Sequence, residues 1–192
     1  MSRKVIGVTG TAGCGKTLLT RFLAAEGAVI IDVDGIGHEV LDEIKEQLVE
    51  SFGDGIISNG EVSRERLGEL VFSDITKLHL LNSMVHPRIK EKIREKLRRF
   101  ENDGIVLLDA ALLFKIGLDE FCDKVVCVRA SKWKCFERLK ERCSDPRRAL
   151  KIITLQDDEE IYKHCDIVVL NNGAKEKLRE KAREIWRLLV NQ

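Results

Sequence analysis

The segment Gly10-Thr11-Ala12-Gly13-Cys14-Gly15-Lys16-Thr17 constrains the fold of this 192-residue chain more than any other stretch. It follows the apolar run Val5-Ile6-Gly7-Val8 and precedes a predicted helix. A glycine, four further residues and Gly-Lys-Thr, placed between a strand and a helix, form the pattern of a loop that cradles phosphate groups. The sequence therefore predicts a strand, a phosphate-binding loop and a helix, in that order.

Each residue type in this loop has a property that phosphate binding needs. Gly10 and Gly15 tolerate positive φ angles, so successive backbone N–H groups can converge on one anion. The dipole of the helix that begins near Lys16 favours phosphate at the same point. Lys16 is expected to reach the β- and γ-phosphates and the Thr17 hydroxyl to bind Mg²⁺, so we assign the whole segment to nucleotide binding. The alternative is a glycine-rich turn that only joins the strand to the helix.

The charge balance of the chain gives no global reason to expect a polyanionic or membrane partner. Lys and Arg total 33, Asp and Glu total 32, and the formal net charge is +1. We therefore predict no nucleic-acid partner and no membrane partner. No segment approaches the length of a membrane span, and the start of the chain does not have the pattern of a signal peptide.

The six cysteines are scattered along the chain without a Cys-x-x-Cys pair. This arrangement disfavours a zinc site and favours reduced thiols, so we predict a cytoplasmic protein. Cys14 is interpreted as a small filler within the loop, although its oxidation would block the site.

Five short apolar runs rich in β-branched residues predict strands. They are continuous rather than alternating, as in a parallel sheet covered on both faces, and helical patterns separate them. The fold class is therefore α/β, with a three-layer α/β/α core around a five-stranded parallel sheet. The predicted strands are Lys4–Thr9, Ala28–Val33, Ile105–Asp109, Lys124–Arg129 and Asp166–Leu170.

The second and third runs are much farther apart than a crossover between parallel strands requires. The residues between them predict helices, with a loop at Gly53–Gly60, and they leave the carboxyl end of a strand, where open α/β sheets bind ligands. We therefore predict a core of residues 1–34 and 105–192 and a helical insertion, residues 35–104, that binds a second substrate. The helices expected in the insertion are Ile36–Phe52, Ser63–Phe72, Asp74–Val85 and Pro87–Phe100.

A second excursion follows the fourth strand and is interpreted as a lid at about residues 138–155. Ser131–Arg142 predicts a helix, and Asp145-Pro146 begins another, with Asp as the N-cap and Pro at the first helical position. Its guanidinium groups would stabilise charge on a transferring phosphoryl group, although each could equally lie on a solvated helix face. The arginines are Arg138, Arg142, Arg147 and Arg148.

Three carboxylates end predicted strands. Asp32 and Asp34 lie two apart at the end of the second strand, so we expect them on one face, where one can accept the proton of an attacking hydroxyl. The alternative is that Asp34 only caps the next helix. Asp109 ends the third strand and is a candidate for the magnesium side of the site, although many buried strands end in Asp.

Pro87 is expected to break the insertion's last helical stretch, because the residue before a proline avoids the helical conformation. A break at this point would direct His86 and Arg88 toward a substrate. The alternative is a purely structural joint.

With these residues assigned, the whole chain resembles the dephospho-CoA kinase family. The phosphate loop, preceded by Val8-Thr9, is similar to that family's loop, and Asp32-Val33-Asp34 is similar to its Asp-Ala-Asp after the second strand. Further similarities are His86-Pro87-Arg88-Ile89, Asp109-Ala110-Ala111-Leu112-Leu113-Phe114, Gln156, and Asp166-Ile167-Val168-Val169-Leu170-Asn171-Asn172-Gly173.

The resemblance implies that ATP and Mg²⁺ phosphorylate the ribose 3′-hydroxyl of dephospho-CoA, giving CoA and ADP. Asp34 would be the catalytic base, Lys16 and Arg142 would balance phosphate charge, and Thr17 and Asp109 would hold the metal. Asn171 and Gly173 would lie near the adenine. The residues implied for the acceptor are Asp32, His38, His86, Arg88 and Leu113.

Three residues depart from the family pattern on the acceptor side: His38 replaces Arg, Ala111 replaces Pro and Lys115 replaces Glu. They keep open a kinase for another nucleotide or small hydroxylated acceptor. A GTPase-type switch is a more distant alternative, but its Asn-Lys-x-Asp segment is missing at the nearest place, Asn171-Asn172-Gly173-Ala174. We expect small-molecule substrates and a monomer or small homo-oligomer.

Overall fold

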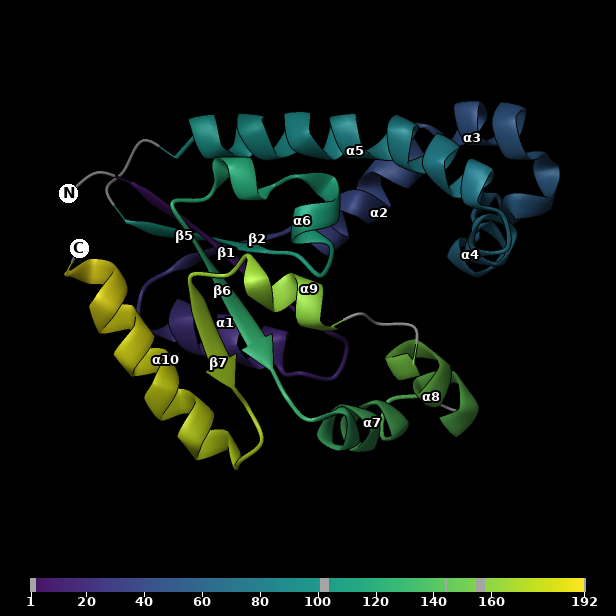
Figure 1. Cartoon of the computed structure of the whole chain (residues 1–192). Helices are drawn as coiled ribbons and strands as arrows, with labels where there is room; N and C mark the ends of the chain where they lie inside the picture. The colour runs from purple at the N-terminus through teal and green to yellow at the C-terminus, as the bar shows by residue number, and fades with distance from the viewer. Residues whose placement is uncertain (1–2, 101–103, 144, 155–157, 192) are drawn as a thin grey trace. The chain divides into compact units, whose positions relative to one another are not determined.

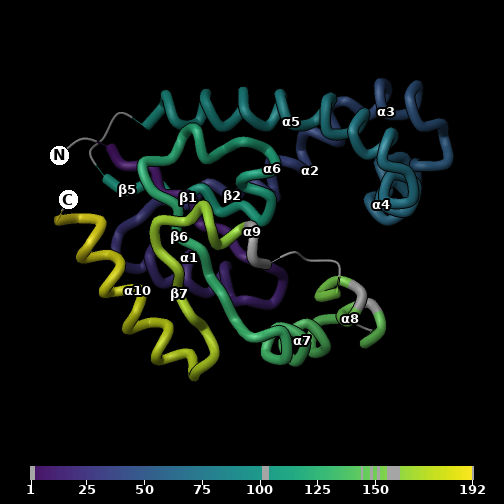
Figure 2. The backbone as a smooth tube through the Cα atoms, in the orientation of Figure 1, coloured from purple at the N-terminus to yellow at the C-terminus, as the bar shows by residue number. Residues whose placement is uncertain are grey.

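The computed structural model describes residues 3–100, 104–143, 145–154 and 158–191. The chain divides into two compact units, one made of Met1–Asp32 and Phe100–Gln192 and the other of Val33–Arg99. Figures 1 and 2 follow the chain through both. The second unit corresponds to the predicted insertion, residues 35–104. It begins two residues earlier than predicted and ends five residues earlier.

The first unit contains a five-stranded sheet in which every neighbouring pair is parallel, with the order β2-β5-β1-β6-β7 (Figure 1). This confirms the predicted α/β class. The two central neighbours of β1 come much later in the sequence, and such a switch in strand order is where open α/β sheets bind ligands. The strands are β1 Lys4–Gly10, β2 Val29–Asp32, β5 Ile105–Asp109, β6 Lys124–Arg129 and β7 Ile167–Leu170.

Aspartates fix where two of these strands begin. Asp123 accepts a hydrogen bond from the Val5 backbone N–H at 2.7 Å, and Asp166 accepts one from the Val125 N–H at 2.7 Å. Asp123, just before β6, thus satisfies a donor of β1, and Asp166, just before β7, satisfies a donor of β6. Asp166 was predicted as the first residue of a strand and instead precedes β7.

Helices flank the sheet and contribute buried side chains to the core of this unit. The residues of the last helix that face the core recur at helical spacing, at Leu178, Ala182, Ile185 and Leu189. The helices are α1 Lys16–Ala25, α6 Leu113–Ile116, α7 Lys132–Lys140, α8 Pro146–Thr154, α9 Asp158–Lys163 and α10 Lys175–Val190, with a 3₁₀ turn at Asp119–Phe121. Asp145 accepts from the Arg147 N–H at 2.9 Å, as expected of a cap for α8.

The second unit begins with two helices where one was predicted over Ile36–Phe52. Helix α2 spans Val33–Glu43 and α3 spans Lys45–Phe52, with Ile44 between them at φ −102° and ψ 20°. Ile44 is buried, at 3 % exposure, so packing of this side chain accompanies the bend. Helix α2 also starts three residues earlier than expected, because it follows β2 without a connecting loop.

The predicted loop Gly53–Gly60 is a 3₁₀ turn, Asp54–Ile56, followed by a small hairpin of β3 Ile57–Ser58 and β4 Glu61–Val62. Asn59 and Gly60 have φ angles of 54° and 84°. Two consecutive positive φ angles suit the two-residue turn that an Asn-Gly pair favours between antiparallel strands. The loop prediction was therefore wrong at this hairpin.

The predicted helix break at Pro87 is also wrong, because α5 runs without interruption from Ile75 to Arg98, after α4 at Arg64–Phe72. A proline lacks the N–H that its helix would use and crowds the preceding turn. The burial of Val85 and Ile89 on either side of the proline stabilises the helix against this cost. The Arg88 side chain donates to the Met84 carbonyl at 2.7 Å and to Gln47 at 2.9 Å.

The structure pairs two of the six cysteines, which was not predicted from the sequence. Cys127 in β6 and Cys165, two residues before β7, form a disulfide. Cys14, Cys122, Cys135 and Cys143 are free thiols. Within the described part of the chain, no helix combines the length and apolar character needed to cross a membrane.

Candidate active site

The loop after β1 has the backbone that its glycines predict. Gly10, Gly13 and Gly15 have φ angles of 151°, 78° and 101°. A Cβ at Gly13 would lie 2.6 Å from the Cys135 carbonyl oxygen, and one at Gly15 would overlap the Asn171 side-chain nitrogen. Larger residues at these positions would therefore suffer both backbone strain and overlap.

Helix α1 begins where this loop ends. Gly15 is its N-cap, and the first turn contains no acidic residue. The first N–H groups of a helix have no partner within the helix and carry part of its dipole's positive end. A strand, a glycine loop with left-handed residues and this helix start together make an anion site of the kind that binds nucleotide phosphates.

Lys16 and Asp109 meet at the carboxyl edge of the sheet. The Lys16 ammonium lies 2.5 Å from an Asp109 carboxylate oxygen, and the two side chains are 13 % and 12 % exposed. Asp32, the last residue of β2, is the register partner of Asp109 in the neighbouring strand. Two carboxylates and a lysine thus lie at adjacent strand ends beside the loop.

These residues fit the prediction of a magnesium site. Mg²⁺ prefers oxygen ligands and usually keeps several waters beside one or two protein groups. Thr17 is exposed in the first turn of α1, and Asp109 supplies a carboxylate close by in the same unit. The described residues contain no group of three or more His, Cys, Asp or Glu that would form a dedicated metal cage.

Cys14 is the one loop residue whose side chain is fully buried. Burial raises the pKa of its thiol to about 12. The side chain fills space under the loop, as the sequence suggested, and is a poor nucleophile at neutral pH.

Arg138 contacts the loop, which its prediction as a lid residue did not anticipate. One guanidinium nitrogen donates to the carbonyls of Gly13 and Cys14, each at 3.1 Å, and the other donates to the Asn171 carbonyl at 2.9 Å. The Asn171 side chain donates to the Cys14 carbonyl at 2.7 Å. Asn171, predicted near the adenine, therefore lies under the loop and is 5 % exposed.

Two other arginines of the predicted lid are exposed. Arg142 lies just after α7, and Arg147 lies at the start of α8. Gln156 and residues 144 and 155 of the expected lid lie outside the described residues.

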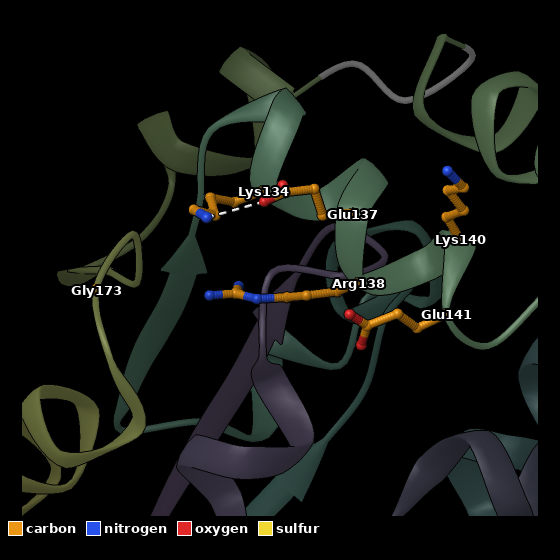
Figure 3. Close-up of a pocket in the computed structure, with 6 residues that line it drawn as sticks. All are labelled: Lys134, Glu137, Arg138, Lys140, Glu141 and Gly173. Carbon is orange, nitrogen blue, oxygen red and sulfur yellow. Dashed lines mark hydrogen bonds and ion pairs between the residues drawn. The ribbon is translucent and has the colours of Figure 1, made fainter.

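A cavity of about 590 Å³ adjoins this part of the site. Figure 3 shows the Arg138 side chain extended from α7 toward the segment that contains Gly173. Lys134 and Glu137 pair with each other at 2.8 Å on the same helix. The lining residues are Lys134, Glu137, Arg138, Lys140, Glu141 and Gly173.

In the second unit, Asp34 and His38 lie four residues apart on α2, and both are exposed. Residues at this spacing are neighbours on one helix face. Asp34 is inside the first turn of α2, so the prediction that strand geometry places it on the face of Asp32 was wrong. Helical spacing pairs Asp34 with His38 instead.

His86 and Arg88 lie on α5, within the continuous helix rather than at a joint. Burial, with a smaller contribution from the Lys90 charge, lowers the pKa of His86. Arg88 is engaged with Met84 and Gln47. Leu113 in the first unit is fully buried against Gly7, so it is a core side chain.

Comparisons with known proteins identify the family of the chain. The family model of dephospho-CoA kinase matches residues 4–177. Dephospho-CoA kinase of Fusobacterium nucleatum is 34 % identical over 186 residues, which are 94 % of this chain and 96 % of that protein. A crystal structure of a Thermus thermophilus protein has a TM-score of 0.85 at 27 % identity and covers 98 % of this chain and 99 % of that one. Dephospho-CoA kinase from Campylobacter jejuni has a TM-score of 0.74 at 24 % identity over 97 % of both chains.

Proposed function

The chain belongs to the dephospho-CoA kinase family, and from this premise we propose how its residues divide the transfer of a phosphoryl group from ATP to dephospho-CoA. The family model covers residues 4–177, which include the loop, the insertion and α7. This coverage is the single observation that carries the assignment. The products of this transfer are CoA and ADP.

The loop and Lys16 bind the triphosphate of ATP. Backbone N–H groups at residues 13–17 and the start of α1 face the β-phosphate, and Lys16 exchanges its Asp109 partner for the β- and γ-phosphates. The lysine then balances charge on the group in transfer, where a positioned cation stabilises the transition state. Arg142, exposed after α7, is proposed to contribute a second positive charge.

Thr17 and Asp109 are the residues that would hold Mg²⁺, which supplies charge neutralisation of the phosphates when bound. Their hydroxyl and carboxylate oxygens suit this ion. Asp32 lies in register beside Asp109 and adds negative charge to the same strand edge.

Asp34 is the proposed base. Its carboxylate accepts the proton of the acceptor hydroxyl as that oxygen forms a bond to the γ-phosphorus, and the bond to the bridging oxygen of ADP breaks. His38, on the same helix face, binds the acceptor's phosphate region. His86 and Arg88 line the acceptor side on α5.

The cavity beside Gly173 is proposed to hold the adenine of ATP. It borders Arg138, which also contacts the phosphate loop, so an occupant there lies in the same unit as the phosphate site. We further propose that the enzyme works in the cytoplasm as a monomer or small homo-oligomer.

The test is to supply the purified protein with ATP, Mg²⁺ and dephospho-CoA and to measure ADP and CoA together. Equal amounts of both products are expected, and none from the Lys16→Ala variant. A panel of nucleotides and hydroxylated metabolites is tested as alternative acceptors. If no CoA forms and one of these acceptors is phosphorylated as ADP is released, that acceptor and not dephospho-CoA is the substrate.

A further inference from the structure

We infer that Arg138 and Asn171 form a latch that holds the phosphate loop in its binding conformation, so that both are positioning residues for the nucleotide. The inference rests on the proposed function, because it assumes that the loop binds phosphate. It assigns to Arg138 a role toward the protein backbone, distinct from the phosphate contact expected of a lid arginine.

The latch consists of four hydrogen bonds onto a short piece of chain. Arg138 donates to the carbonyls of Gly13, Cys14 and Asn171 at 2.9–3.1 Å, and Asn171 donates to Cys14 at 2.7 Å. The Asn171 backbone N–H donates to Arg129 at 2.7 Å, which ties the latch to the end of β6. The Cys14 carbonyl therefore accepts from two side chains that come from α7 and from the end of β7.

These bonds determine where the loop's N–H groups point. A trans peptide is planar, and its carbonyl and the following N–H point in opposite directions. The described chain has no cis peptide. Fixing the Cys14 carbonyl toward Asn171 and Arg138 therefore directs the Gly15 N–H to the other side of the loop, where the phosphate site is expected.

Arginine is suited to this role and lysine is not. A guanidinium offers five donors in a rigid plane and can hold two carbonyls with one nitrogen and a third with another, as it does here. An ammonium carries the same charge but lacks this fork, so it cannot hold the carbonyls of Gly13 and Asn171 together. An Arg138→Lys change therefore keeps the positive charge of the side chain and removes its hydrogen-bond geometry.

The experiment measures binding of MgATP and of magnesium tripolyphosphate, which has no base, by calorimetric titration. Variants Arg138→Lys and Asn171→Leu are compared with wild type. Arg183→Lys is the matched control, because Arg183 in α10 makes an exposed ion pair with Glu26 at the end of α1. Asn171→Leu keeps a similar side-chain size and removes the donor without adding a charge near the loop. Thermal unfolding establishes that each variant is folded.

We expect both latch variants to weaken both ligands by a similar factor of about tenfold or more, since each loses a hydrogen bond that involves a charged group or a buried acceptor. The double variant should lose less than the product of the two factors, because both side chains hold the Cys14 carbonyl. Arg183→Lys should change neither affinity.

Weakened ATP binding with unchanged tripolyphosphate binding would overturn the inference, since Arg138 would then be a base ligand. Unchanged binding of both ligands would overturn it too. If one variant fails to fold, the other decides by the same titrations, and failure of both would make the pair a general structural element. If wild-type protein binds neither ligand, the proposed function fails instead.

Discussion

The donor side and the acceptor side of the proposed site are built differently. The donor side, formed by residues 10–17 with Asp109, Arg138 and Asn171, is fixed by glycine conformations, a buried ion pair and hydrogen bonds to backbone carbonyls. On the acceptor side, Asp34 and His38 are exposed residues on one helix. The donor side therefore depends on backbone geometry, whereas the acceptor side depends on which side chains a helix presents.

This difference predicts which positions tolerate substitution. A backbone nest accepts few substitutions, because each glycine meets a neighbour or adopts a left-handed φ. An exposed helix position accepts many residues with little effect on stability. We therefore expect substitutions at Gly13 and Gly15 to disturb the loop, and a substitution at His38 to leave the fold unchanged.

The largest effect is expected from removing the donor-side charge. Lys16→Ala should lower kcat by about 10³-fold or more, because it removes the lysine of the phosphate loop and the Asp109 carboxylate loses this partner. ADP release measured with saturating ATP provides the check. Lys132→Ala, an exposed lysine at the start of α7, is the control and should retain full activity. Substantial turnover by the Lys16 variant would separate the loop from catalysis.

On the acceptor side, Asp34→Asn should lower kcat by about 10²- to 10⁴-fold, because an amide cannot accept the hydroxyl proton. ATP affinity should stay within twofold of wild type, since the donor side is untouched. Asp42→Asn, an exposed carboxylate on the same helix, provides the comparison. Normal turnover by the Asp34 variant would make another group the base.

The acceptor side should also respond to the side chain at position 38. His38→Ala is expected to raise the KM for dephospho-CoA by about two- to fivefold, the effect of losing one exposed contact, while ATP affinity stays near that of wild type. His38→Arg should keep the low KM. An unchanged KM in the His38→Ala variant would exclude a phosphate contact by His38.

The smallest effect concerns stability within the second unit. The pKa of His86 is lowered in the folded protein by burial, so the unfolded chain binds its proton more readily. The free energy of unfolding should therefore fall as pH decreases from about 6.5, the value for an unperturbed histidine, to the lower folded value. Urea titrations across this range provide the measurement, and His86→Gln should show a smaller slope than wild type.

Much of the first unit could be predicted because its signals are local. Continuous β-branched runs predicted all five strands, and the spacing of Gly10, Gly15 and Lys16 predicted the loop, since left-handed backbone and a helix start need those residue types. The contact between Arg138 and the Cys14 carbonyl could not be predicted in this way. It depends on where two distant helices and a strand end meet in the folded chain.

Two errors in the second unit have a common cause, because packing overrode local preference at Pro87 and at Ile44. Pro87 lies inside α5, where buried Val85 and Ile89 stabilise the helix on either side of it. The bend at Ile44 follows from burial and has no glycine or proline to indicate it. The hairpin at Asn59-Gly60 did carry a local signal, an Asn-Gly turn, which we interpreted only as a loop.

Because β2 passes directly into α2, only one residue separates two carboxylates in the sequence. Asp32 ends the strand, Val33 begins the helix, and Asp34 follows. Two trans peptides span at most about 7.6 Å between Cα atoms, whatever the orientation of the elements they join. Covalent geometry therefore keeps the Cα of the proposed base within that distance of the Cα at the end of β2, with the single buried residue Val33 between them.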